Sequence, residues 1–261
     1  NAVKEKYPEI IVIGTTGPFY EGTDYEAGWE LATKLGVPMV DEHYYVEPGW
    51  LIHNQDYYDR YDRNKAKVYL GEYAAHLPGR PNNVETALAE ALFLTAVERN
   101  GDVVAMTSYA PLLAKEKHTQ WNPDLIYFNN TEIKPTVGYY TQLMYGQNAG
   151  NQYLPSTVSL SNTQDAVKKR IGVSVVKEDR TGDYMVKLVN MLPVEVTSQV
   201  TLEDVSFLSP SATKTILTGA PADRKAKPVS TDFELSGNSF PYTMPAYSFT
   251  VIRIQSKGNA H

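Results

Sequence analysis

The chain has 261 residues, of which 42% are hydrophobic and 21% charged, a profile typical of a globular protein with a sizeable core. Lys and Arg number 24 against 30 Asp and Glu, and the resulting net charge of −6 argues against a nucleic-acid binder. The chain has no cysteine, which excludes disulfides and thiolate chemistry, and no apolar run of the roughly 18 residues that a membrane span needs.

The first part of the chain alternates between strand patterns and helix patterns. The apolar run at 10–16 is typical of a strand buried on both faces. In the most regular helix, Asn82 and Glu85 resemble a capping box. Four successive βα units predict a parallel sheet, and four are too few to close an eight-unit barrel. The predicted strands are 10–16, 37–45, 67–74 and 102–109, and the predicted helices are 25–35, 56–63, 84–100 and 136–145.

The pattern changes near residue 150. Short alternating runs follow, Gly, Pro, Asn and Asp separate them, and no convincing helix is predicted among them. Such runs are typical of an antiparallel β-sandwich. We therefore expect two domains, over 3–153 and 154–261. The predicted strands of the second are 171–177, 184–190, 195–202, 214–218 and 247–254.

Glu72 is the first candidate for chemistry, because it ends the third predicted strand. Strict alternation places it on the same face as Val68 and Leu70, and an acid on an apolar face is costly unless it is used or paired. Catalytic residues of parallel barrels follow the carboxyl ends of strands. A solvated Glu at a strand end is the structural alternative.

The preceding strand ends in a second group of polar side chains. His43 and Tyr45 share one face there, and Glu42 points to the other. A histidine that hydrogen-bonds the backbone at a loop edge is the alternative. The five histidines lack metal-ligand spacing, so we expect neither a metal nor a cofactor.

Aromatic residues are concentrated in the first half, which holds 16 of the 19 Tyr and all three Trp. Those near the loops that follow strands could stack on the apolar faces of sugar rings. Ordinary packing in the core is the alternative, and it should account for most of the tyrosines. The residues near these loops are Trp50, Tyr57, Tyr58, Trp121 and Tyr127.

Five segments in this order resemble the α-L-arabinofuranosidases of glycoside hydrolase family 51, and the resemblance covers nearly the whole chain. They read DEHYY at 41–45, VYLGEYA at 68–74, SYAPLL at 108–113, WNPDLIYF at 121–128 and MPAYSFTVI at 244–252.

The resemblance implies an α/β plus all-β fold: the second half of a TIM-type (β/α)8 barrel, followed by a jelly-roll-like antiparallel β-sandwich. It implies a retaining glycosidase that releases terminal α-L-arabinofuranosyl residues from arabinan- or arabinoxylan-type polysaccharides. Glu72 matches the nucleophile of this family. His43 and Tyr45 match residues that line the sugar site and support the nucleophile, and Trp121 is a further candidate for substrate binding.

The general acid/base of the family is a Glu that follows an Asn at the end of the fourth barrel strand. The chain has no matching Asn-Glu, so we expect this residue upstream and the chain alone to be a truncated, inactive portion. A half barrel has two open edges, which favours self-association. The stretch 110–112, where some relatives place a Gln that contacts the sugar, reads Ala-Pro-Leu, so subsite contacts are not carried over.

Two other functions stay open. One is another retaining barrel glycosidase, such as a xylosidase or endoglucanase, in which the role of Glu72 would be kept. The other is a non-catalytic carbohydrate-binding module, against which the sandwich offers only three Tyr and no Trp. The compartment is not determined, although the lack of cysteine agrees with a periplasmic or secreted protein.

Overall fold

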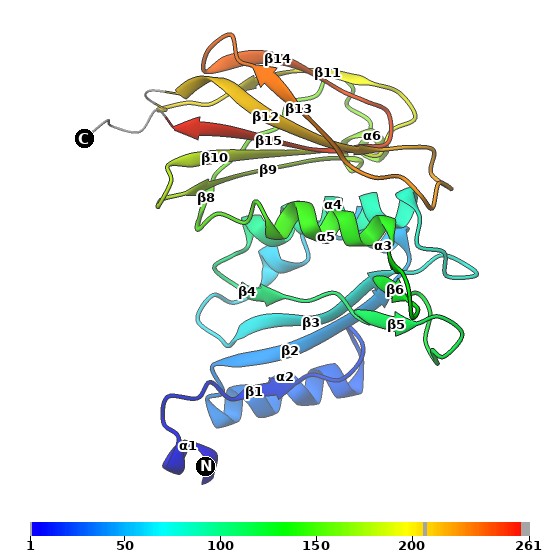
Figure 1. Ribbon diagram of the computed structural model, residues 1–261. Coiled ribbons are helices and arrows are strands. Elements are labelled where there is room, and N and C mark those ends of the chain that lie inside the picture. Colours follow the sequence, from blue (N-terminus) through cyan, green and yellow to red (C-terminus); the bar gives the residue numbers. More distant parts are fainter. Residues whose placement is uncertain (1, 206–207, 257–261) are drawn as a thin grey trace.

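A computed structural model describes residues 2–205 and 208–256, and its N-terminal half is built on a four-stranded parallel sheet (Figure 1). The strands lie across the sheet in chain order, and the strands at its two edges, the first and the fourth, stay open within the described residues. The predicted alternation of strand and helix is confirmed, and the sheet is an open half of a barrel. Its strands are β1 (Ile13–Thr15), β2 (Met39–Val46), β3 (Lys67–Ala75) and β4 (Val104–Thr107).

The first strand differs from the prediction. Only Ile13–Thr15 pairs with β2, and the residues before it are exposed, Ile11 by 60%. Because β1 is an edge strand, it has a neighbour on one side only. The expectation of a strand over 10–16 that is buried on both faces is therefore wrong for the described chain.

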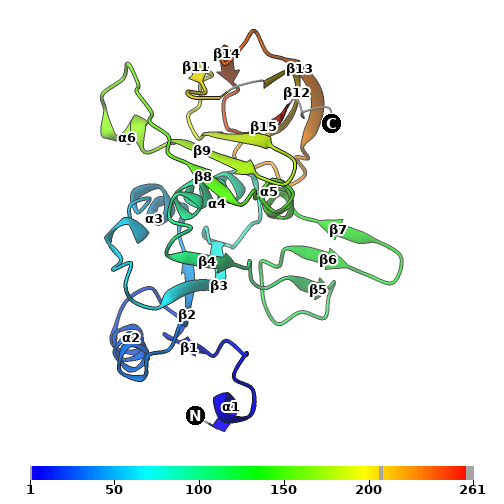
Figure 2. The same cartoon turned by 90° about the vertical axis from the view of Figure 1, so that its left-hand side faces the viewer.

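The helices lie mostly on the outer face of the sheet (Figure 2). The stretch 56–63 forms only a single 3-10 turn, whereas a helix just before it, with Pro48 in its first turn, was not predicted. The helices are α1 (Ala2–Lys6), α2 (Thr23–Leu35), α3 (Pro48–His53), η1 (Tyr58–Arg60), α4 (Val84–Arg99), α5 (Val137–Gly146) and α6 (Asp165–Lys168), the last a short helix within the β-rich half.

Helix α4 is buried on nearly all sides, because it lies between the parallel sheet and the β-rich half (Figure 1). Its cap is one residue later than predicted: the Asn83 side chain accepts from the backbone N–H of Thr86, and the Thr86 hydroxyl accepts from that of Asn83. Asn82 instead accepts from the backbone N–H of Gly138 at 2.8 Å and so ties α4 to α5. The pattern of a capping box can thus identify a helix start and still miss the capping residue.

The C-terminal half is the predicted antiparallel β-sandwich. A six-stranded sheet in the order β13-β12-β15-β10-β9-β8 packs against the pair β11 and β14 over a core of its own. β8, β13 and β14 were not predicted. The predicted domain boundary at 153/154 falls inside β8, which pairs with β9 of the sandwich, so this boundary stays a prediction. The strands are β8 (Gln152–Leu154), β9 (Ile171–Glu178), β10 (Asp183–Asn190), β11 (Val196–Thr201), β12 (Leu208–Thr218), β13 (Val229–Glu234), β14 (Ser239–Met244) and β15 (Ser248–Ser256).

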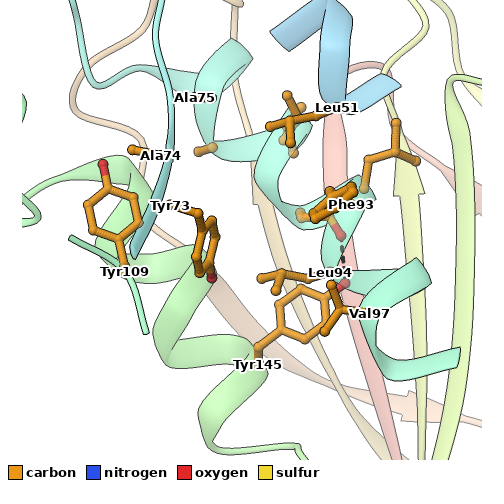
Figure 3. Close-up of a cluster of buried hydrophobic side chains, with 14 of the residues drawn as sticks. Leu51, Tyr73, Ala74, Ala75, Phe93, Leu94, Val97, Tyr109 and Tyr145 are labelled. Carbon is orange, nitrogen blue, oxygen red and sulfur yellow. Dashed lines mark hydrogen bonds between the residues drawn. The ribbon is translucent and has the colours of Figure 1, made fainter. Parts of the chain in front are cut away.

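A continuous core and a buried ion pair join the two halves. The core on the outer face of the parallel sheet includes Tyr73, Phe93 and Tyr145 (Figure 3) and extends to β10 and β15 of the sandwich. Lys187 of β10 is fully buried, and its Nζ lies 2.5 Å from the Glu98 carboxylate of α4. Burial raises the pKa of Glu98 and lowers that of Lys187, so each depends on the other to stay charged.

The chain between β4 and α5 forms a small sheet, which lies to one side of the parallel sheet (Figure 2). It consists of β5 (Leu113–Lys115), β6 (Ile126–Phe128) and β7 (Ile133–Pro135) and was not predicted. The loop between β5 and β6 carries Trp121.

Candidate active site

Strand β2 separates its side chains onto two faces, as the sequence predicts. Asp41, His43 and Tyr45 are partly exposed on the inner face, the side of the sheet away from the helices. Glu42 and Tyr44 are fully buried on the outer face. The predicted pair His43 and Tyr45 does share a face.

Strand β3 departs from strict alternation. Glu42 lies opposite Leu70, whereas His43 lies opposite Glu72, so Gly71 is one extra residue, a β-bulge. The bulge turns Glu72 to the inner face beside His43, away from the buried face of Leu70. The expectation that Glu72 shares the apolar face of Leu70 is therefore wrong, because it assumed a regular strand.

The Glu72 carboxylate receives two side chains of β2. The Tyr45 hydroxyl donates to Oε2 at 2.6 Å, and Nδ1 of His43 lies 3.5 Å from the same oxygen. Burial, followed by the bond to Glu72, raises the pKa of Tyr45, which keeps the phenol protonated and able to donate. With its side chain 42% exposed, Glu72 is both held and accessible.

Tyr45 in turn packs between two rings. The His76 ring stacks on it at 5.2 Å with an interplanar angle of 19°, and the Trp121 ring lies 5.7 Å away. The Arg80 guanidinium lies 5.0 Å from the Trp121 ring. The structure therefore brings Trp121, more than 40 residues away in sequence, to the residues around Glu72.

Two residues of this group, His76 and Arg80, were not singled out from the sequence. The signal was their position directly after the strand that carries Glu72, where barrel enzymes place functional groups. Burial, with the Arg80 charge, lowers the pKa of His76 to about 4, so the ring is neutral near pH 7. Asp41 was also missed, although it precedes His43 by two residues on the same face of β2.

Tyr127 braces the loop that presents Trp121. Its hydroxyl accepts from the Asp124 backbone N–H at 3.0 Å and donates to the Asn122 side chain at 2.9 Å. Tyr127 is thus a support for this loop.

The other predicted aromatic residues lie behind the sheet. There the buried Glu42 carboxylate accepts from Trp29 Nε1 at 2.8 Å, from the Tyr61 hydroxyl at 2.9 Å and from Tyr44. Burial raises the pKa of Glu42, while these donors lower it. Three aromatic residues pack around this group, so core packing is the correct reading for them: Trp50, Tyr57 and Tyr58.

The inner face can therefore supply one carboxylate that accepts a hydrogen bond from Tyr45, with the imidazole of His43 3.5 Å away and an aromatic wall beside it. The groups that contact Glu72 are a phenol and an imidazole, and neither is a carboxylic acid. Among the described residues, no cluster of three or more His, Asp or Glu could hold a metal ion.

Comparisons with known proteins identify the family of the chain. Residues 56–248 match the family described as α-L-arabinofuranosidase C-terminal domain, which is well over half of the chain. The chain belongs to this family. It corresponds to the C-terminal portion of an α-L-arabinofuranosidase of glycoside hydrolase family 51.

Named arabinofuranosidases are among the curated relatives. The extracellular exo-α-L-arabinofuranosidase of Streptomyces chartreusis is 44% identical over 155 residues, 59% of this chain and 18% of that protein. The probable α-L-arabinofuranosidase A of Aspergillus terreus is 30% identical over 97% of this chain and 38% of its own length. The chain thus spans between about a fifth and two fifths of these relatives.

Solved structures share the same architecture. An arabinose-bound α-L-arabinofuranosidase of family 51 has a TM-score of 0.85 at 27% identity and covers 98% of this chain, which is 41% of that structure. The arabinose complex of the Thermotoga maritima enzyme has a TM-score of 0.74 over 97% of this chain and 59% of that structure. Its identity of 14% shows the fold alone.

Proposed function

We propose that the protein containing this chain is a retaining α-L-arabinofuranosidase, which releases terminal arabinofuranosyl residues from arabinan- or arabinoxylan-type polysaccharides. The observation that carries this proposal is the Glu72 carboxylate, turned by a bulge to the carboxyl end of the inner face and held there by Tyr45. The named activity of the relatives supports the choice of substrate.

Glu72 is suited to act as the nucleophile. The contacts of Tyr45 and His43 both fall on Oε2, which leaves Oε1 to attack the anomeric carbon. The hydrogen bond from Tyr45 favours the ionised carboxylate that attack requires. The Trp121 ring, with an exposed fraction of 40%, offers a flat apolar surface for a sugar next to this point.

Retaining glycosidases need a second carboxyl group roughly 5 Å from the first, to protonate the leaving oxygen. Since the groups that contact Glu72 are a phenol and an imidazole, we infer that the acid/base comes from residues outside this sequence. Among the described residues, the polar inner-face side chains of β2, and Glu72 of β3, stay partly exposed, which leaves them accessible to such residues. This chain alone is then inactive, and it needs neither a metal nor a cofactor for this chemistry.

The direct test is arabinose release from 4-nitrophenyl α-L-arabinofuranoside by the full-length protein. Glu72→Gln should reduce kcat at least about 10³-fold, because the amide cannot form the covalent intermediate. Glu116→Gln is the control, since this surface acid pairs with Lys134 outside the site. Robust activity of this chain alone that survives Glu72→Gln would overturn both the nucleophile and the external acid/base.

A xylosidase or endoglucanase activity is the second candidate. A bifunctional glucanase-xylanase has a TM-score of 0.58 over 88% of this chain, and at 15% identity this shows the fold alone. A panel of aryl arabinosides, xylosides and cellobiosides separates the candidates. Titration of residues 155–261 with arabino-oligosaccharides tests the remaining alternative, a carbohydrate-binding sandwich.

We further propose that isolated copies of this chain associate through the open edges of the sheet. Ile11 and Val12 are exposed beside β1, Met106 is exposed on β4, and Leu113 is exposed on β5. A cleft of about 1070 Å³ lined partly by β4 adds to this uncovered surface. Light scattering should show dimers or larger species at micromolar concentration, and a clean monomer would contradict the proposal.

The relative from Streptomyces is named extracellular, and we propose a secreted or periplasmic location for this protein as well. None of the helices in residues 2–205 and 208–256 is long and apolar enough to cross a membrane. Fractionation of the source cells, with activity assayed in each fraction, tests the location.

A further inference from the structure

Asp41 and His43 share the inner face of β2, and the Asp41 carboxylate contacts the His43 ring on the nitrogen opposite the one that faces Glu72. Oδ2 of Asp41 is 2.9 Å from Nε2 of His43, while Nδ1 of the same ring faces Glu72. An ionised carboxylate can only accept, so this contact requires the ring proton on Nε2. Asp41 therefore fixes the orientation of the imidazole; since Glu72 is also a carboxylate, Nδ1 can donate to it only when the ring carries a second proton.

We propose that Asp41 is a positioning residue for the nucleophile, acting on Glu72 through His43. The proposal rests on the function proposed for Glu72 and extends it by one residue. The three side chains form a continuous line across two strands, from Asp41 through the ring of His43 to Glu72. Without Asp41 the ring could rotate, and its contact with Oε2 of Glu72 would be lost.

The backbone of Asp41 is held by Thr16, the residue that follows β1. Its carbonyl accepts from the backbone N–H of Thr16 at 3.0 Å and from the Thr16 hydroxyl at 2.9 Å. Thr16 is fully buried just after β1, and Gly28 of α2 packs so closely that a Cβ there would lie 2.6 Å from the Thr16 Cα. The segments of β1 and α2 thus help to fix the position of the Asp41 backbone, and with it the position of its side chain.

The bulge in β3 makes room for the same carboxylate. A Cβ on Gly71 would lie 1.9 Å from Oδ1 of Asp41, so any side chain there would displace the Asp41 carboxylate. This Oδ1 is buried and has no hydrogen-bond partner among the described residues, which is costly for a group with a purely structural role. Gly71 therefore serves Glu72 twice, by turning it inwards and by admitting the Asp41 carboxylate behind His43.

The first test reads the His43 ring itself and needs no activity. In this chain labelled with 15N-histidine, long-range 1H–15N spectra should show His43 protonated at Nε2, with the signal assigned by its loss in His43→Gln. Asp41→Ala should shift these ring resonances, and Asp183→Asn should leave them unchanged, because Asp183 pairs with Arg253 in the sandwich. Unchanged His43 resonances in Asp41→Ala would overturn the proposal.

The second test measures turnover by the full-length protein. Asp41→Ala should lower kcat about 10²-fold and leave KM within about threefold, because a misplaced nucleophile slows chemistry more than binding. Asp41→Asn should recover part of the loss, since its amide oxygen still accepts from Nε2–H. Equal loss in both variants, or an unchanged kcat, would overturn the proposal. Failure of Glu72 as the nucleophile would appear separately, as activity that survives Glu72→Gln.

Discussion

Glu42 and Glu72 lie on adjacent strands of one sheet but on opposite faces. Glu42 is fully buried behind the sheet, where indole and phenol groups donate to both of its oxygens. Glu72 is partly exposed on the inner face, and the contacts of its neighbours fall on Oε2. The same side chain thus serves the fold on one face and is available for chemistry on the other.

The difference shows how the surroundings decide the role of a carboxylate. On the outer face, Trp29 of α2 and the tyrosines around η1 surround the Glu42 carboxylate, which gains its stability from these fixed donors. On the inner face, solvent and a few donors keep a carboxylate ionised and open to attack a substrate. Variants on the two faces should therefore differ in what they change, either the free energy of unfolding or turnover.

The largest effect on stability is expected for Glu42→Ala. Three donors, the fully buried Tyr44 and the partly buried Trp29 and Tyr61, would lose their acceptor at about 1–3 kcal/mol each, for a total of about 5 kcal/mol. Urea unfolding of this chain measures the change, with Glu72→Ala as the control from the inner face. A similar loss in both variants would contradict the distinction between the faces.

Glu90 extends the comparison to pH. It is buried on α4, and burial raises its pKa to about 8. The unfolded chain releases this proton near pH 4.3, so the free energy of unfolding should fall by roughly 3 kcal/mol between pH 5 and pH 7.5 and level off above pH 8. Glu90→Gln should remove this slope, and Glu85→Gln at the start of the helix should keep it. Parallel pH profiles for Glu90→Gln and the unmodified chain would contradict the assignment.

Gly71→Ala tests the bulge at the border between the two faces. The added Cβ would clash with Asp41, so we expect a loss of about 2 kcal/mol in the free energy of unfolding. Gly49→Ala is the matched control, because no atom lies within 4 Å of a Cβ there. Thermal unfolding compares the two variants. If Gly71→Ala were as stable as Gly49→Ala, the close approach of Asp41 would be wrong.

The smallest effect is expected for Trp121→Ala, on the exposed side of the inner face. The unfolding free energy should change by less than about 0.5 kcal/mol, since the ring is partly exposed. In the full-length protein, KM should rise up to about tenfold, equivalent to about 1.4 kcal/mol of lost stacking. Trp121→Phe should retain most of the affinity. A KM that is the same in Trp121→Ala would exclude this ring from the sugar site.

Local patterns predict much of the fold. The alternating pattern of β2 and the periodic face of α4 depend on neighbours in sequence, and the predicted types and approximate bounds of both elements are confirmed. The small sheet of β5, β6 and β7 was missed, because its strands of three residues are too short to show a period. The exposure of β1 was missed for another reason, since burial depends on which strands lie beside it.

The candidate site follows the same division. The sequence by itself determined that Glu72, His43 and Tyr45 end adjacent strands of a parallel sheet, because strand order and direction follow from the βα repeat. Only the tertiary structure decided which face Glu72 takes, because one extra residue at Gly71 reverses the alternation. It also decided which aromatic rings reach the site, since Trp121 arrives through a loop and Trp50 does not. Those choices depend on register and on contacts between distant segments, which a period of two residues does not encode.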